Sequence, residues 1–252
     1  MCDRCGCQGP DSRLAPSAGS ERSAAESGAG SREIQVEGRI LAENDRLARH
    51  NRAHFVEHRL FAINLMGAPG AGKTALLEAT IRAMAGRWRV AAIEGDQATQ
   101  RDRDRIAATG AAVEQIETGL GCHLDAHQVH HALDRLPLAG VDALFIENVG
   151  NLVCPALFDL GEHLRVVVTS PTEGADKPLK YPPMFRAADL VVLNKIDLLP
   201  HVPFDLSDWH GYVMAINRRA TILMTCATSG AGIDDWIAVL MRARGAAAGA
   251  SR

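Results

Sequence analysis

The 252-residue sequence predicts an α/β fold, in which a mainly parallel central sheet is covered by helices on both faces. Short apolar runs alternate along the chain with segments of helical spacing. The runs are apolar at nearly every position, which is typical of strands buried on both faces of a parallel sheet. A glycine-rich turn directly follows the first of them. Ligands of such sheets bind at the carboxyl ends of the strands.

The N-terminal part differs in composition from the rest. Residues 1–7 form a cysteine motif, and residues 8–33 are rich in Ser, Gly, Ala and charge. Such a segment buries too little apolar surface to offset the entropy of ordering, so we expect a flexible linker. The domain is predicted over residues 34–244, beginning with a helix from Ile34 to His58, and residues 245–252 are expected to be a disordered tail.

The strands and helices of this domain follow in alternation. Strands are predicted over Leu60–Met66, Arg89–Glu94, Val113–Glu117, Ala143–Glu147, Leu164–Thr169, Leu190–Asn194 and Thr221–Thr225. Helices include Thr74–Ala85, Asp125–Leu136 and Asp234–Arg242.

The overall composition argues against several classes of function. A net charge of −3 gives no reason to expect nucleic-acid or anionic-membrane binding. The chain has no apolar run long enough to span a membrane and no secretory signal, so we expect a soluble, cytoplasmic protein. Six cysteines in such a protein indicate metal-binding or catalytic thiols rather than disulfides.

The glycine-rich turn has the pattern of a phosphate-binding loop. It lies between a predicted strand and a predicted helix, where backbone N–H groups and the helix dipole favour phosphate oxygens. The lysine would reach the β and γ phosphates, and the threonine hydroxyl would bind Mg²⁺. The alternative is a flexible glycine turn. The predicted nucleotide contacts here are Gly67, Ala68, Pro69, Gly70, Ala71, Gly72, Lys73, Thr74 and Ala75.

A second motif selects guanine as the base. Asn194-Lys195-Ile196-Asp197 follows a predicted strand, and the Asp197 carboxylate can accept hydrogen bonds from N1–H and the 2-amino group of guanine. The alternative for Asp197 is a solvated helix cap. The later loop Cys226-Ala227-Thr228 stands where GTPases place a Ser-Ala-Lys loop against the base, with Thr228 in place of the lysine. We therefore expect GTP.

Two carboxylates at strand ends suit Mg²⁺ and an attacking water. Glu147 begins an E-x-x-G segment, comparable with the usual D-x-x-G switch, and Asp96 follows another strand. Each could instead be a solvated loop acid. The catalytic set is therefore Lys73, Thr74, Asp96 and Glu147, of which the last three would hold Mg²⁺. Because no water-orienting glutamine or arginine finger is identifiable, we expect slow intrinsic hydrolysis.

Thiols and imidazoles indicate a further metal site. Cys122 and His123 are predicted to open a helix, whose dipole would stabilise a thiolate, and S and N donors suit Zn²⁺ or Ni²⁺. His123, His127 and His131 would form one stripe on that helix, or else a solvated polar face. Cys154 follows Glu147 by seven residues, so the phosphate site and a metal ligand share a segment. We expect Cys122, His123 and Cys154 to bind one ion, with water, His127 or a second subunit at any vacancy.

Cys2, Cys5 and Cys7 place three soft donors within six residues. Three thiolates with the terminal amine or a water suit Ni²⁺ or another borderline-soft ion. The alternative is an oxidisable end without function.

Together these motifs, with Glu94-Gly-Asp96, Glu147-Asn-Val-Gly-Asn151 and Cys154-Pro155 in this order, resemble the hydrogenase nickel-incorporation GTPase family, HypB. The resemblance implies a GTPase that uses GTP and Mg²⁺ and helps to insert nickel into a [NiFe]-hydrogenase large-subunit precursor, working with the HypA chaperone. It further implies a high-affinity nickel site at Cys2, Cys5 and Cys7, a Ni²⁺ or Zn²⁺ site at Cys122, His123 and Cys154, and a GTP-dependent homodimer. The segment Thr172 to Lys180 is similar to a region that reaches the nucleotide site.

Other functions fit the sequence less well. A urease accessory GTPase would carry Cys-Pro-His, but Ala156 follows Pro155 here. A non-catalytic nickel or zinc buffer would not need Lys73, Thr74 and Asp197. A small-molecule kinase would leave the guanine motif and the thiols without a role.

Overall fold

The computed structural model describes residues 21–96, 100–119 and 121–250. Its strands are β1 (Phe61–Met66), β2 (Val90–Asp96), β3 (Ala112–Glu117), β4 (Ala143–Glu147), β5 (Leu164–Thr169), β6 (Leu190–Leu193) and β7 (Thr221–Met224). They form one sheet in the order β3-β2-β4-β1-β5-β6-β7, and every neighbouring pair is parallel. The predicted α/β fold is thereby confirmed.

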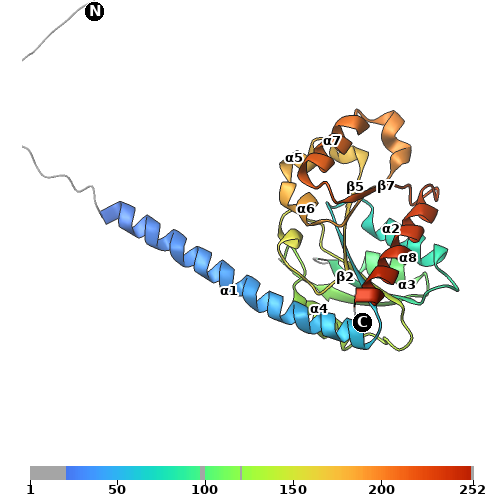
Figure 1. Ribbon diagram of the computed structural model, residues 1–252, viewed down its shortest axis with the longest axis horizontal. Helices are drawn as coiled ribbons and strands as arrows, with labels where there is room; N and C mark the ends of the chain where they lie inside the picture. Colours follow the sequence, from blue (N-terminus) through green and yellow to red (C-terminus); the bar gives the residue numbers. More distant parts are fainter. Residues whose placement is uncertain (1–20, 97–99, 120, 251–252) are drawn as a thin grey trace, which may run out of the picture. The chain divides into compact units, whose positions relative to one another are not determined.

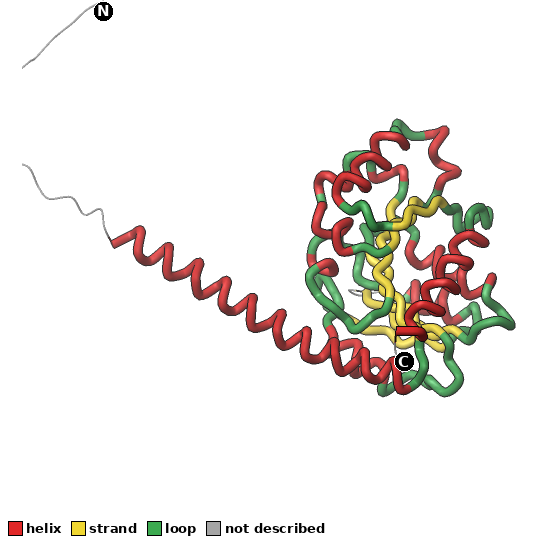
Figure 2. Tube along the Cα trace, viewed as in Figure 1, coloured by secondary structure: helices red, strands yellow, loops and turns green. Residues whose placement is uncertain are grey.

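Helices cover both faces of the sheet (Figures 1 and 2). The α-helices are α1 (Glu21–Glu57), α2 (Lys73–Ala83), α3 (Arg101–Ala107), α4 (Ala126–Leu133), α5 (Lys177–Lys180), α6 (Pro182–Ala187), α7 (Leu206–Ile216) and α8 (Ile233–Ala250). Short 3₁₀ turns lie at η1 (Cys154–Ala156), η2 (Pro171–Glu173) and η3 (Ile196–His201). None of the helices among the described residues has the length and hydropathy needed to cross a membrane.

Alternation along the strands divides the core into two layers. On one face Ile63, Phe145 and Val166 pack against α2, α3 and α8. On the other face Ala62 and Ile146 pack against α4 and the end of α1, while α6 and α7 cover the strands on the far side of β1. Successive strand side chains point to opposite faces, so strands that are apolar throughout can fill both layers.

Two segments that were predicted to be flexible or disordered are helical in the structure. Helix α1 begins at Glu21 and therefore includes the second half of the predicted linker, 8–33. Helix α8 continues to Ala250, although residues 245–252 were expected to be disordered. Alanine-rich stretches favour helix, and composition alone underestimated this preference. The first half of the linker and Cys2, Cys5 and Cys7 lie outside the described residues.

Candidate functional site

The glycine-rich turn connects β1 to α2 in a tightly packed conformation. Gly70 and Gly72 have φ angles of 77° and 96°, in the left-handed region that favours glycine. A Cβ at Gly67 would collide with the backbone oxygen of Val168, and one at Gly72 with the side-chain amide of Asn194. The turn therefore requires glycine at these positions and presents the N-terminus of α2, where a phosphate is favoured.

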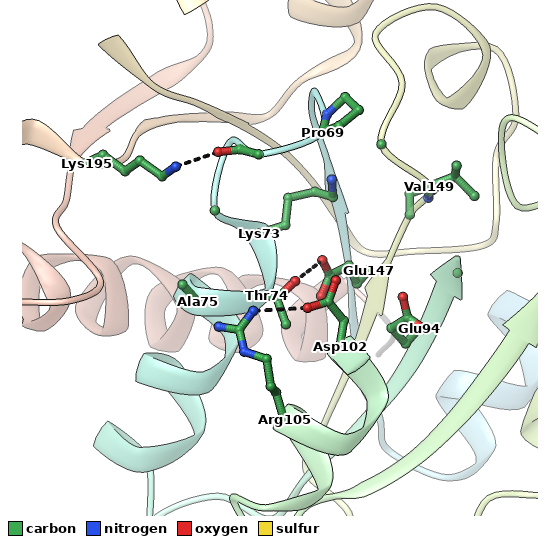
Figure 3. A pocket seen from close by; sticks show the side chains of 15 residues that line it. Pro69, Lys73, Thr74, Ala75, Glu94, Asp102, Arg105, Glu147, Val149 and Lys195 are labelled. Atoms are coloured by element: carbon green, nitrogen blue, oxygen red, sulfur yellow. Dashed lines mark hydrogen bonds and ion pairs between the residues drawn. The ribbon is translucent and has the colours of Figure 1, made fainter. Parts of the chain in front are cut away.

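A pocket of about 480 Å³ opens beside this turn, at the carboxyl ends of β1, β2 and β4 (Figure 3). Its lining combines the turn with the segment after β4 and with α3. Three of the residues predicted for phosphate chemistry, Lys73, Thr74 and Glu147, line this pocket. The further lining residues are Pro69, Gly70, Gly72, Ala75, Glu94, Gly95, Asp102, Arg105, Asn148, Val149, Gly150 and Lys195.

Lys73 and Glu147 are buried in this pocket. Lys73 Nζ donates long hydrogen bonds to the carbonyl oxygens of Gly67, at 3.3 Å, and Ala68, at 3.4 Å. Burial lowers the pKa of Lys73, and the nearby Glu147 carboxylate acts in the opposite sense. Burial also raises the pKa of Glu147 to about 7, although Lys73 opposes that shift. The surroundings therefore balance the charges of Lys73 and Glu147 only in part, as expected at a site that binds a charged ligand.

The arrangement around Glu147 fits a hard divalent cation. Thr74 Oγ1 donates a 2.7 Å hydrogen bond to Glu147 Oε1. The other carboxyl oxygen, Oε2, is buried and has no hydrogen-bond partner among the described residues. A hydroxyl and a carboxylate oxygen are donors that Mg²⁺ prefers. Asp96 ends β2 beside Glu117 of β3, and the role of its side chain stays a prediction.

The guanine motif lies against the glycine-rich turn. Asn194 Nδ2 donates to the carbonyl oxygens of Ala71 and Gly72, both at 3.3 Å, and Asn194 Oδ1 accepts from Ala227 N at 3.2 Å. Lys195 has a φ of 60° and donates from Nζ to Gly70 O at 2.6 Å. Asn194 therefore connects the phosphate turn to the loop after β7.

Asp197 and the loop after β7 lie together. Cys226 Sγ donates to Asp197 Oδ1 at 3.0 Å, while Thr228 is exposed. The carboxylate of Asp197 thus faces the loop that was predicted to contact the base. Cys226 lies in this loop and contacts Asp197 directly. Their contact with a base stays a prediction.

Cys122, His123 and Cys154 come together as predicted. Their donor atoms all lie within 4.8 Å of one another, and the three residues are half-buried. Cys122 Sγ lies 2.9 Å from Cys154 Sγ and 3.6 Å from His123 Nδ1, and neither thiol is in a disulfide. Two thiolates on a tetrahedral ion with bonds of about 2.3 Å lie about 3.7 Å apart, so the pair would open by less than about 1 Å to bind.

A short segment joins this triad to the phosphate pocket. Asn148, directly after Glu147, accepts hydrogen bonds through Oδ1 from the backbone N–H groups of Leu124 and Val149, both at 3.0 Å. Asn151 forms an antiparallel bridge with Gly67 of the glycine-rich turn. The segment from Glu147 to Cys154 therefore contacts the metal loop through Asn148 and the glycine-rich turn through Asn151.

One prediction about the metal loop is wrong. Helix α4 begins at Ala126 and is capped by Asp125, whose side chain accepts from Gln128 N, so Cys122 does not open a helix. The acidic cap fixes the helix start three residues later. His123 consequently leaves the predicted stripe and stacks on Phe158, with ring centroids 3.9 Å apart. His127 is not part of the described Cys122, His123 and Cys154 group.

Several pocket residues were not predicted. Asp102 and Arg105 of α3 line the pocket and are joined by a 3.0 Å hydrogen bond (Figure 3). Glu173, in the segment Thr172 to Lys180, is not among the residues that line this pocket, and burial raises its pKa. The acidic first turn of α3 was the only sequence signal for Asp102. Lys180 pairs with Asp176 at 2.6 Å.

Comparison with known proteins places these features in context. Residues 61–224 match the model of the CobW/HypB/UreG nucleotide-binding domain. Hydrogenase maturation factor HypB of Azotobacter vinelandii is 53% identical over 215 residues, which are 85% of this chain and 71% of the relative. The same factor of Escherichia coli K12 is 50% identical over 206 residues, covering 82% and 71%.

Two crystal structures are similar in both sequence and fold. HypB from Archaeoglobus fulgidus has a TM-score of 0.76 at 43% identity, covering 81% of this chain and 99% of that one. HypB from Helicobacter pylori in complex with nickel has a TM-score of 0.77 at 34% identity, covering 80% and 95%.

Proposed function

The chain belongs to the HypB group of the CobW/HypB/UreG nucleotide-binding family, and from this premise we propose that it is a GTP-hydrolysing nickel metallochaperone. It assists nickel insertion into a [NiFe]-hydrogenase large-subunit precursor, with HypA as a partner and a GTP-dependent homodimer as the working form. Nickel is its cargo, and Zn²⁺ is a second ion that the same donors accept. The protein acts in the cytoplasm.

The phosphate pocket supplies the residues for GTP hydrolysis. Lys73 would neutralise the β and γ phosphates, and its lowered pKa would return toward the ordinary value beside them. Thr74 and Glu147 would hold Mg²⁺, with Asp96 as a further ligand, and the bound ion would neutralise charge on the phosphate oxygens. Asp197 would select guanine by accepting two hydrogen bonds.

The observation that carries the proposal is the segment from Glu147 to Cys154. It begins in the phosphate pocket, contacts the metal loop through Asn148 and ends at a thiol of the metal triad. A change at the γ phosphate that moves Glu147 would therefore change the separation of Cys154 from Cys122 and His123. GTP hydrolysis would then release or capture the cargo ion.

The test measures Ni²⁺ and Zn²⁺ affinity with GDP and with a non-hydrolysable GTP analogue. We expect the wild type to show a different affinity in the two states, and Cys122→Ala to lose both the site and the difference. Lys73→Ala weakens nucleotide binding. In this variant the triad should bind metal with the same affinity whether GDP or the GTP analogue is added. Equal affinity in both nucleotide states of the wild type would refute the coupling.

A further inference from the structure

A second pocket, of about 540 Å³, opens at the end of the sheet opposite the phosphate turn. The phosphate turn follows the last residue of β1, whereas this pocket is lined by Phe61, the first residue of β1. The end of α1 and the last turns of α8 form its other sides. Its size lies within the range of roughly 300–1,000 Å³ that is typical of small-molecule sites. The pocket is therefore large enough for a ligand of its own, away from the nucleotide.

The lining combines apolar walls with positive charge. Phe55, Leu60 and Phe61 line the pocket and are otherwise buried. Arg59 and Arg244 line it as well, and none of its described lining residues is an aspartate or a glutamate. The Arg59 side chain is exposed and makes no hydrogen bond or ion pair within the described part of the chain. Such a pocket favours an anion that carries an apolar body.

Arg59 has a backbone conformation that favours glycine. Leu60 N donates to Phe55 O at 2.8 Å, and Arg59 N donates to Val56 O at 3.1 Å. These are the two hydrogen bonds of a Schellman motif, which ends α1 and usually has glycine where Arg59 stands. Arg59 has a φ of 55°, and the one other non-glycine residue with positive φ in the described ranges is Lys195, which lines the phosphate pocket. An arginine at this strained position points to a use for its side chain.

Two further donors of the pocket are held in place by their neighbours. Arg244 Nη2 donates to Asp142 Oδ1 at 2.8 Å, and the guanidinium lies 4.8 Å from the centroid of the Trp88 ring. Because a guanidinium has five N–H donors, Arg244 keeps donors for a ligand. His163 Nδ1 accepts from Ala62 N at 3.1 Å, so the proton of the neutral ring is on Nε2, which is a donor.

We propose that this pocket binds a small amphipathic carboxylate, with an aromatic or branched aliphatic body, and that Arg59 is its principal anchor. The guanidinium fork matches a carboxylate with two parallel hydrogen bonds, which favours the acid over a neutral alcohol of the same shape. The body of the ligand would lie against Phe55 and Phe61, with Arg244 as a second positive charge. This site needs neither GTP nor nickel and does not depend on the proposed GTP-coupled function.

The test uses the full chain saturated with GDP and Mg²⁺, so that the probes do not enter the phosphate pocket. Calorimetric titration compares 2-naphthoate with 2-naphthalenemethanol, its neutral counterpart, and 4-methylpentanoate serves as an aliphatic acid. We expect 2-naphthoate to bind at least tenfold more tightly than the alcohol, and Arg59→Gln to remove this advantage. The matched control is Arg49→Gln, an exposed arginine of the same helix outside the pocket, which should leave both affinities unchanged.

Two more variants separate this site from an effect on folding. Arg59→Gly suits the left-handed conformation, so its thermal unfolding midpoint should equal or exceed that of the wild type while 2-naphthoate binding weakens tenfold or more. Ala248→Phe, at an exposed lining position of α8, should block both the acid and the alcohol. The proposal is overturned if neither acid binds the wild type, if the alcohol binds as tightly as 2-naphthoate, if both Arg59 variants bind like the wild type, or if Ala248→Phe leaves binding unchanged.

Discussion

The side-chain oxygen of Asn148 accepts a hydrogen bond from the backbone N–H of Leu124 at 3.0 Å. Asn148 directly follows Glu147 of the phosphate pocket, and Leu124 directly follows His123 of the metal triad. The same oxygen also accepts from Val149 N, and Asn148 Nδ2 donates to Asn64 Oδ1 at 3.3 Å. This buried amide is therefore a direct polar contact between the two proposed sites.

Asn148→Ala should weaken the dependence of metal affinity on nucleotide. Loss of the amide leaves the buried N–H of Leu124 without its acceptor, which costs about 1–3 kcal/mol of unfolding free energy. GTP and Ni²⁺ should each still bind, because Asn148 contributes no atom to either proposed ligand set. The measurement is Ni²⁺ affinity with GDP and with the GTP analogue.

The control for this prediction is Asn51→Ala. Asn51 is a buried amide that donates to Ala126 O and Leu160 O, away from the phosphate pocket. Its loss should destabilise the fold to a similar extent and leave the nucleotide dependence of metal affinity intact. If both variants reduce that dependence equally, the effect comes from general destabilisation rather than from Asn148.

The raised pKa of Glu147 should make stability depend on pH. Its pKa is about 7 in the folded protein, against 4.5 as the ordinary value. Between these values the folded protein holds a proton that the unfolded chain has released. The free energy of unfolding should thus fall as pH rises through this window, by up to about 3 kcal/mol, and the stabilisation is complete only below it.

Glu147→Gln should remove this dependence, because the amide stays neutral. Denaturant unfolding at pH 5 to 8, without nucleotide or divalent ions, should show the variant gaining on the wild type up to about pH 7 and no further. Lys73→Met should extend the window upward, since Lys73 lowers the pKa of Glu147. A difference between variant and wild type that does not change with pH would contradict the assignment.

Asp197→Asn should exchange guanine for xanthine specificity. It weakens two charge-assisted hydrogen bonds of about 1.5–3 kcal/mol each, so GDP affinity should fall by roughly 100-fold or more. The new amide can donate to the C2 oxygen of xanthine, so XDP should bind better than it does to the wild type. Calorimetric titration with both nucleotides measures this. Asp197→Ala should lose GDP binding without gaining XDP, and retention of GDP affinity in both variants would exclude Asp197 from the base site.

Removal of residues 1–7 should abolish the tightest nickel site and leave GTP hydrolysis unchanged. The three thiols Cys2, Cys5 and Cys7 are the softest donor group of the chain and precede the nucleotide-binding fold. Nickel titration and phosphate release measure the two properties. Loss of hydrolysis would mean that these residues belong to the catalytic domain.

Local features of the sequence were sufficient to predict the strands, the glycine-rich turn and the parallel sheet. Two predicted strands, Ala143–Glu147 and Leu164–Thr169, agree with β4 and β5 residue for residue. A continuous apolar run or a glycine-rich turn is encoded by neighbouring residues, and parallel strands with a common direction place their ends at one edge. For the same reason, the meeting of Cys122 with Cys154 could be anticipated from the strands that precede them.

Only the tertiary structure decided what surrounds each side chain. The raised pKa of Glu147 depends on burial and on Lys73, and the contact of Asn148 with Leu124 joins residues 24 positions apart. The Asp125 cap separated His123 from His127 and His131, and packing of α1 on α4 brought His50 beside His130. Desolvation and through-space contacts depend on how distant segments pack against one another. This packing cannot be predicted from residue spacing alone.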